Sequence, residues 1–210
     1  MFHKNGDCFL GLFPLYWPQK GDDEKVSREK KQSTSALTAA AMMAAVLCVL
    51  GPLSVPVGPV PVAMANFGVS LAAWLLGPRY GALSVAAYLL LGAVGAPVFA
   101  GAGAGAAVLF GPTGGYLIGY LAQALIGGWA VERSGGRVLW SGLGLAAGVA
   151  VSYAFGTAWF ILQMGCTLPY ALTVCVLPFI PFDAAKVALA SVLGSILRRA
   201  LHRAGLLHHN

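Results

Sequence analysis

Residues 138–163 read VLWSGLGLAAGVAVSYAFGTAWFILQ, an apolar run without a charged side chain. A helix rises about 1.5 Å per residue, so about 20 apolar residues cross a hydrocarbon core of about 30 Å. This segment is long enough for one crossing. We see no alternating segments of about ten residues, which a membrane β-barrel requires. The run therefore predicts an all-α membrane protein.

The composition of the whole chain supports this class. Of its 210 residues, 58% are hydrophobic and 10% are charged, and the mean hydropathy is +0.77. A soluble domain has about 25% charged residues. The net charge of +6 does not indicate a nucleic-acid partner, because the basic residues lie between apolar segments and not along one polar face. The four cysteines are scattered without a Cys-x-x-Cys pair, so we expect no disulfide framework and no metal site.

Five further apolar segments flank residues 138–163, which predicts six transmembrane helices. Prolines and glycines separate the segments, as in the Pro-rich turn 51–61 and at Gly77-Pro78-Arg79. We expect a flexible polar tail over 1–35, a membrane domain over 36–200 and a C-terminal tail over 201–210. The predicted spans are about 35–50, 62–76, 80–94, 117–131, 138–163 and a last helix that ends at Arg198-Arg199. Pro178 and Pro181 predict that this last helix starts or kinks just before Asp183.

The basic residues predict the orientation of the helices. Apart from Lys186, every Lys and Arg lies in a terminal tail, at Arg79 or in the loop with Arg133 and Arg137. The other three connections have none. Because Lys and Arg favour the cytoplasmic side, both termini are expected in the cytoplasm of a cell-membrane protein.

Asp183 and Lys186 are the charged residues that no tail or loop accounts for. A charge within a bilayer costs about 2.5 to 3.5 kcal/mol on insertion scales, so it persists mainly where it pairs or binds a ligand. Their spacing puts both side chains on one helical face. A carboxylate accepts and an ammonium donates, so the pair complements a neutral ligand with N–H and C=O groups. The alternative is a salt bridge that only holds helices together.

Two small-residue motifs each allow two interpretations. Gly111-Pro-Thr-Gly-Gly-Tyr116 suits a loop that enters a helix beside a ligand, but Gly115 and Gly119 also have the Gly-x-x-x-Gly spacing of helix packing. Ala36, Ala40 and Ala44, with Ala41 and Ala45, form a small-residue face on the first helix. That face serves either internal packing or the docking of a second membrane protein.

Five motifs in this order resemble the BioY family, the biotin-binding S components of energy-coupling-factor vitamin transporters. The resemblance covers about residues 36–200. The motifs are Pro59-Val-Pro61, Leu76-Gly-Pro-Arg79, Pro97-Val-Phe99, Gly111-Pro-Thr-Gly-Gly-Tyr-Leu-Ile-Gly119 and Pro178-Phe-Ile-Pro-Phe-Asp-Ala-Ala-Lys186.

The resemblance implies a receptor that captures biotin outside the cell and delivers it inward. Its implied partners are a transmembrane coupling subunit and two ATPases, with biotin as the transported ligand and no cofactor. Ala41 and Ala45 match the family's docking face, and the Pro-rich turn matches a lid. Asp183 and Lys186 would hold the ureido ring of biotin, with the rest of the implied site at Thr113, Gly114, Gly115, Tyr116, Phe99 and Asn66.

The chain departs from the family pattern at two places. The usual Thr and Gln after the Val-Pro motif are Ala63 and Ala65, which leaves Asn66 as the polar residue there. Phe182 stands where Gly is common. The ligand class is unaffected, whereas contacts from the second helix are in question.

Three other functions compete with biotin uptake. They are an S component for another small vitamin, a structural membrane subunit and an intramembrane enzyme that uses Asp183 as acid or base. The spans contain no second acidic residue, histidine or nucleophile motif, which argues against an enzyme.

Overall fold

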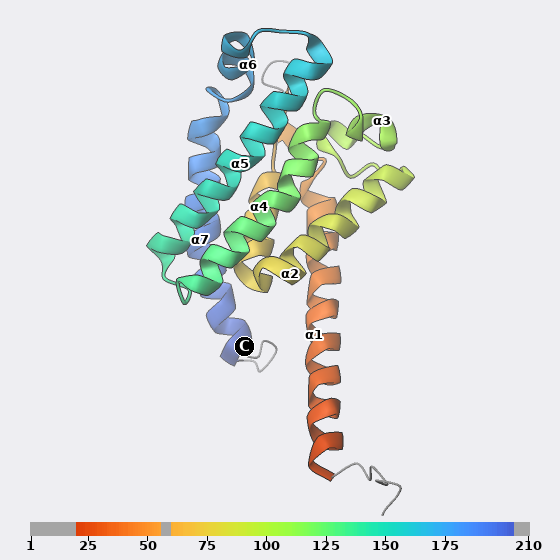
Figure 1. The fold of residues 1–210 in the computed structure, drawn as a ribbon, viewed down its shortest axis with the longest axis vertical. Helices are drawn as coiled ribbons and strands as arrows, with labels where there is room; N and C mark the ends of the chain where they lie inside the picture. Colours follow the sequence, from red (N-terminus) through yellow and green to blue (C-terminus); the bar gives the residue numbers. More distant parts are fainter. Residues whose placement is uncertain (1–19, 56–59, 204–210) are drawn as a thin grey trace, which may run out of the picture.

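The computed structural model describes residues 20–55 and 60–203, and most of them are helical (Figure 1). Of the tails predicted over 1–35 and 201–210, residues 1–19 and 204–210 lie outside the described range, as does part of the Pro-rich turn at 56–59. Residues 20–35 are not an irregular tail but the first turns of a helix, and 201–203 end the last helix. The elements in chain order are α1 (Lys20–Leu50), β1 (Ser54–Val55), β2 (Val62–Ala63), α2 (Ala65–Val94), η1 (Ala100–Ala102), α3 (Ala106–Leu109), α4 (Gly114–Arg133), α5 (Val138–Met164), α6 (Leu168–Cys175) and α7 (Phe179–Arg203).

Helix α2 contains two of the predicted spans, joined by a sharp kink. Gly77 has φ 72° and ψ −172°, and Pro78 follows it. A positive φ of this kind is accessible to glycine at little cost, while proline lacks the N–H that would continue the helix. The two arms of α2 form a V in Figure 1. The predicted break at Gly77-Pro78-Arg79 is therefore present, as a bend within one element.

Three of the described helices are long and apolar enough to cross a membrane: α2, α5 and residues Phe179–Leu201 of α7. Residues Thr34–Leu50 of α1 form a shorter apolar helix. Large apolar side chains such as Leu90, Leu139 and Leu162 point outward and are exposed. Because so much exposed apolar surface is unfavourable in water, it belongs in lipid. The predicted class, a helical membrane protein, is confirmed.

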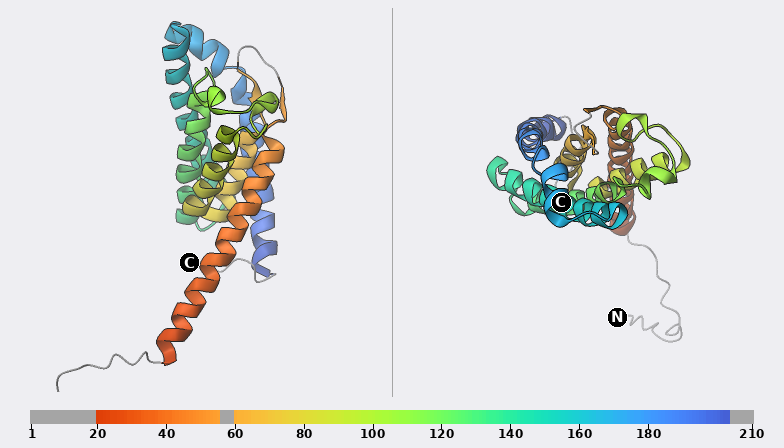
Figure 2. Two further views of the ribbon diagram at one scale, coloured as in Figure 1. Left: turned by 90° about the vertical axis from the view of Figure 1, so that its right-hand side faces the viewer. Right: turned by 90° about the horizontal axis from the view of Figure 1, so that it is seen from above.

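The connections divide the molecule into two ends. At one end lie the β1–β2 pair, η1 with α3, and α6, which we call the loop end (Figures 1 and 2). The short antiparallel pair of Ser54 with Ala63 was not predicted within the Pro-rich turn. At the opposite end lie the kink of α2 and the turn between α4 and α5. That end carries Arg79, Arg133 and Arg137.

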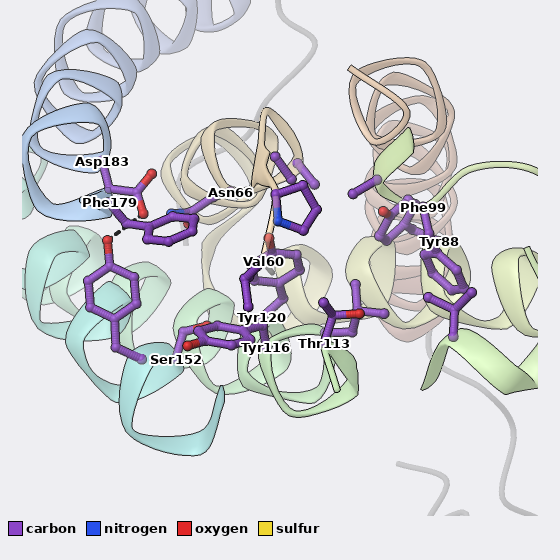
Figure 3. Close-up of a pocket in the computed structure, with 17 residues that line it drawn as sticks. Val60, Asn66, Tyr88, Phe99, Thr113, Tyr116, Tyr120, Ser152, Phe179 and Asp183 are labelled. Atoms are coloured by element: carbon purple, nitrogen blue, oxygen red, sulfur yellow. Dashed lines mark hydrogen bonds between the residues drawn. The ribbon is translucent and has the colours of Figure 1, made fainter. Parts of the chain in front are cut away.

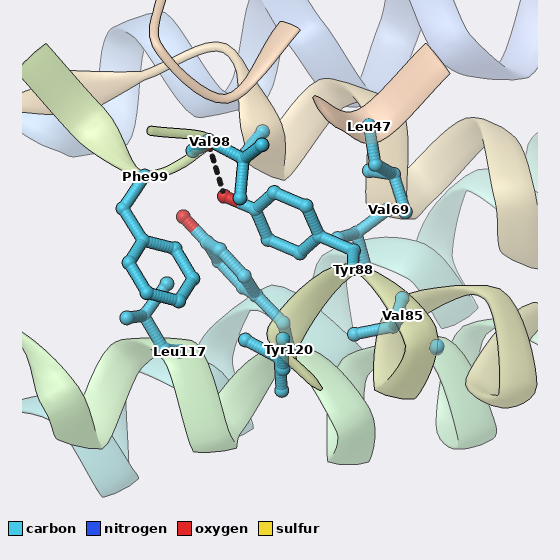
Figure 4. Packing of buried hydrophobic residues seen from close by; sticks show 11 residues of the cluster. Leu47, Val69, Val85, Tyr88, Val98, Phe99, Leu117 and Tyr120 are labelled. Carbon is cyan, nitrogen blue, oxygen red and sulfur yellow. Dashed lines mark hydrogen bonds between the residues drawn. The ribbon is translucent and has the colours of Figure 1, made fainter. Parts of the chain in front are cut away.

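A core of buried side chains lies beneath the loop end (Figure 4). Tyr88 and Phe99 meet edge to face there, with ring centroids 5.7 Å apart at an angle of 90°. The Tyr88 hydroxyl donates to the Val98 carbonyl oxygen over 3.1 Å. These contacts join the second arm of α2 to the segment that precedes η1. Tyr88 and Phe99 also form part of the wall of a cavity at the loop end.

Candidate ligand-binding site

A cavity of about 260 Å³ lies at the loop end, between the helices and their connections (Figure 3). Pockets for drug-sized ligands measure about 300 to 1,000 Å³, so this cavity suits a compact molecule. Most of its wall is apolar or aromatic. The polar and aromatic lining residues are Asn66, Tyr88, Phe99, Thr113, Tyr116, Tyr120, Ser152, Tyr153, Phe179 and Asp183.

Asp183 forms part of the cavity wall, and the residue is 5% exposed. Lys186 Nζ donates to Asp183 Oδ1 over 3.0 Å and to the Ala63 carbonyl oxygen over 2.9 Å. The Tyr153 hydroxyl donates to Asp183 Oδ2 over 2.5 Å. The pair thus joins α7 to α5 and to the segment before α2. Lys186 does not line the cavity itself.

The position of Asp183 follows from a break in the chain. Residues 168–203 form two helices, because α6 ends at Cys175 and α7 begins at Phe179, directly after Pro178. Pro181 then lies in the first turn of α7, where its missing N–H leaves no hydrogen bond unmade. Asp183 follows in the next turn and faces the cavity. The predicted start of the last helix at these prolines agrees with the structure.

The segment before α4 is tied to α5 by side chains. Trp159 Nε1 donates to the Gly111 carbonyl oxygen and Gln163 Nε2 to that of Phe110, each over 2.9 Å. Thr113 lines the cavity next to them. The Tyr116 hydroxyl, also in the wall, donates to the Cys175 carbonyl oxygen over 3.3 Å. The wall is therefore held in place without a ligand.

Gly114 and Gly115 do not line the cavity, although they flank residues that do. A Cβ on Gly114 would collide with the Leu109 carbonyl oxygen, and one on Gly115 with the Trp159 side chain. Both glycines permit close packing, and Gly119 packs in the same way against Ser152 of α5. The packing interpretation of this motif accounts for these contacts. The contribution of Gly114 and Gly115 to the site is indirect in this geometry.

The BioY family model matches residues 24–203. The chain belongs to the BioY family. A "Biotin transporter BioY" from Thermotoga maritima is 38% identical over 164 residues, which cover 78% of this chain and 95% of that protein. "Biotin transporter BioY2" from Lactococcus lactis is 36% identical over 168 residues, 79% of this chain and 91% of that protein.

A solved structure is similar to the fold as well. It is described as a crystal structure of "the S-component for biotin from an ECF-type ABC transporter". It has a TM-score of 0.75 and 34% sequence identity, and the match covers 80% of this chain and 93% of that one. The resemblance to the BioY family inferred from the sequence motifs is confirmed.

The cavity brings together most of the residues that the BioY resemblance implied, and others that the sequence did not indicate. Asn66, Phe99, Thr113, Tyr116 and Asp183 line it. Tyr120, Ser152 and Tyr153 line it too. Tyr and Ser are unremarkable in an apolar helix. Only Tyr120 had a signal, because it lies one helical turn after Tyr116 on α4; Ser152 and Tyr153 on α5 had none. On α1, Ala40 and Ala44 are buried whereas Ala41 and Ala45 are exposed.

Proposed function

We propose that this protein is the substrate-binding membrane subunit of a biotin uptake system. It captures biotin from outside the cell and delivers it inward with an ATP-driven energy-coupling-factor module. It acts as a binding and transport protein and not as an enzyme. The observation that carries the proposal is the Asp183–Lys186 ion pair, with the Asp183 carboxylate in the wall of the cavity.

The cavity chemistry fits the ureido ring of biotin. That ring presents N–H donors beside a carbonyl acceptor, and Asp183 offers carboxylate oxygens to the N–H groups. Among the described residues, each Asp183 oxygen has one donor, Lys186 or Tyr153, and retains a lone pair for a ligand. Aromatic side chains such as Tyr116 and Phe179 supply apolar walls for the remaining carbon and sulfur atoms. The apolar lining and the single carboxylate together favour a small, mostly neutral molecule.

We propose six transmembrane segments with both termini in the cytoplasm of the cell membrane. The two arms of α2 on either side of Gly77 count as two spans, together with the apolar part of α1, α4, α5 and α7. Arg79, Arg133 and Arg137 lie at the end opposite the cavity, and basic residues favour the cytoplasmic side. This orientation opens the loop end to the exterior, where biotin arrives. The proposal keeps the 36–200 membrane domain with a polar tail on either side, over 1–35 and 201–210, although residues 20–35 are helical as part of α1.

The partners in the proposal are a transmembrane coupling subunit and two ATPase subunits. The exposed side chains of Ala41 and Ala45 give α1 a smooth outer face. Small residues allow helices in a bilayer to approach closely. That face is therefore proposed as the docking surface for the coupling subunit. Lipid covers the rest of the apolar exterior.

A structural subunit and a receptor for a different vitamin are the competing functions. A salt bridge that only joined helices would need no void beside it, whereas Asp183 borders one. An S component for another vitamin would fill the same cavity with a different ligand. The discriminating measurement is equilibrium binding of labelled biotin to the purified protein, with unlabelled thiamine and riboflavin as competitors. We expect unlabelled biotin to displace the labelled biotin, and thiamine and riboflavin not to displace it.

The variant Asp183→Asn tests the site directly. It leaves Lys186 without its counter-charge and replaces a carboxylate acceptor, so it is expected to remove most of the affinity for biotin. Ser191→Ala is the matched control, since Ser191 is buried on the same helix and donates only to the Val187 carbonyl oxygen. It should bind biotin like the parent. Parental affinity in folded Asp183→Asn would remove the basis of the proposal.

A further inference from the structure

Gln123 is a completely buried amide in the middle of α4, 0% exposed. Its Nε2 donates to Asn66 Oδ1 over 2.6 Å and to Ser70 Oγ over 3.1 Å, and lies 3.4 Å from the Asn66 carbonyl oxygen. Its other polar atom, Oε1, is sealed and has no hydrogen-bond partner in the part of the chain that the structure describes. A leucine would fill this space without the desolvation cost of an unpaired oxygen. The presence of an amide therefore calls for a role beyond packing.

The neighbours of Gln123 allow one orientation of its amide. The Ser70 hydroxyl donates its proton to the Asn66 carbonyl oxygen over 3.0 Å, and a carbonyl can only accept. Ser70 Oγ must then accept from Gln123, so Gln123 presents its NH₂ group to α2. The Asn66 carbonyl oxygen, also an acceptor, lies on the same side. Gln123 is thus a donor toward α2.

This orientation also determines the orientation of the Asn66 amide. Because Gln123 donates, Asn66 must turn Oδ1 toward Gln123, and Nδ2 then points away from Gln123. Asn66 lines the cavity and is 7% exposed (Figure 3). Among the described residues, Asn66 Nδ2 has no hydrogen-bond partner. Unlike Gln123 Oε1, however, it is not completely buried. The free donor therefore has access to space, and the cavity is the space that Asn66 borders.

Asn66 lies at the same end of the cavity as Asp183. Lys186, bound to Asp183, also donates to the carbonyl oxygen of Ala63, shortly before the first turn of α2. Ala63, Asn66 and Asp183 all line the cavity. An acceptor from α7 and a donor from α2 thus face one ligand group. A ureido group, with N–H next to C=O, matches that arrangement.

We infer that Gln123 is a positioning residue that holds the Asn66 amide with Nδ2 toward the cavity, where it donates to the ureido carbonyl oxygen of the ligand. This inference rests on the proposed function. Gln123 itself touches no ligand and acts through Asn66. Without it, the Asn66 amide is free to rotate and the donor is held in place only part of the time.

A double-mutant cycle in biotin binding tests the inference. Asn66→Ala and Gln123→Leu are each expected to weaken binding by about 10-fold, the usual effect of one hydrogen bond. The double variant should bind no more weakly than Asn66→Ala alone, since Gln123 acts only through Asn66. Independent losses that multiply in the double variant would overturn the inference. Gln123→Met, of the same length, replaces Gln123→Leu if that variant does not fold.

A ligand analogue adds a measurement that a purely structural role would not affect. In 2-thiobiotin, sulfur replaces the ureido carbonyl oxygen and accepts hydrogen bonds poorly. The parent should prefer biotin over 2-thiobiotin by a larger factor than Gln123→Leu does. Equal preference in both proteins would contradict the inference even if Gln123→Leu lowered affinity. A parent that does not bind biotin would instead refute the proposed function, so the two failures are distinguishable.

Discussion

Removing Lys186 should separate the structural contribution of the ion pair from its role in binding. Lys186 Nζ lies 3.0 Å from Asp183 Oδ1, and the two side chains are 11% and 6% exposed. At this distance the attraction is about 5.5 kcal/mol with an effective dielectric constant of about 20. Desolvation offsets part of this, and loss of one partner of a buried pair typically costs about 3 to 5 kcal/mol. We expect Lys186→Met to lose stability in that range.

The double variant Asp183→Leu with Lys186→Met leaves no unpaired charge. Replacing both charges with apolar groups is often neutral for stability, although Tyr153 and the Ala63 carbonyl lose partners at about 1 to 3 kcal/mol each. Lys186→Met also loses the Ala63 contact, so the double variant adds only the loss at Tyr153 and avoids the larger cost of an unpaired Asp183 carboxylate. It should therefore be no less stable than Lys186→Met. Neither variant should bind biotin.

The assay combines unfolding in detergent with biotin binding, each measured on the folded fraction. If the pair were only structural, the double variant would bind biotin as the parent does. That result would refute the assignment of Asp183 to the ligand. A Lys186→Met variant with parental stability would refute the estimate from the ion-pair geometry.

Two further variants test other parts of the account. Tyr153→Phe removes the hydroxyl that donates to Asp183 and should weaken biotin binding by about 10- to 100-fold, since a hydrogen bond to a charged group contributes about 1.5 to 3 kcal/mol. The exposed Tyr170 offers the control Tyr170→Phe, and equal affinities of the two variants would exclude this role. Ala45→Trp on the outer face of α1 should abolish biotin uptake by cells that contain the coupling subunits. Binding by the purified variant should stay unchanged, and normal uptake would contradict docking at Ala41 and Ala45.

Local chemistry made parts of the fold predictable. The bend of α2 follows from Gly77 and Pro78. Glycine adopts a positive φ and proline lacks an N–H whatever their neighbours are, so the sequence alone predicts the break. Pro178 likewise predicted the start of α7. Helix α1, in contrast, begins at Lys20 within the polar region before the apolar run, and apolar patterning gives no signal for such a start. The β1–β2 pair was missed for a similar reason, since it depends on the meeting of two short segments.

The site was predictable where a residue was out of place in its segment. Asp183 and Lys186 stood out as charges between apolar neighbours. Tyr153 and Gln123 did not, since their roles depend on which helix face meets α7 or α2, and that follows from the packing of distant segments. Close packing was one of the two interpretations that the glycine motif allowed, and the structure shows it for Gly115.

The most direct test of the central claim is an experimental structure of the protein with bound biotin. The account predicts that the ureido ring lies in the cavity at the loop end, with an N–H group within hydrogen-bond distance of the Asp183 carboxylate. Biotin bound elsewhere, with the space beside Asp183 and Lys186 empty, would contradict it.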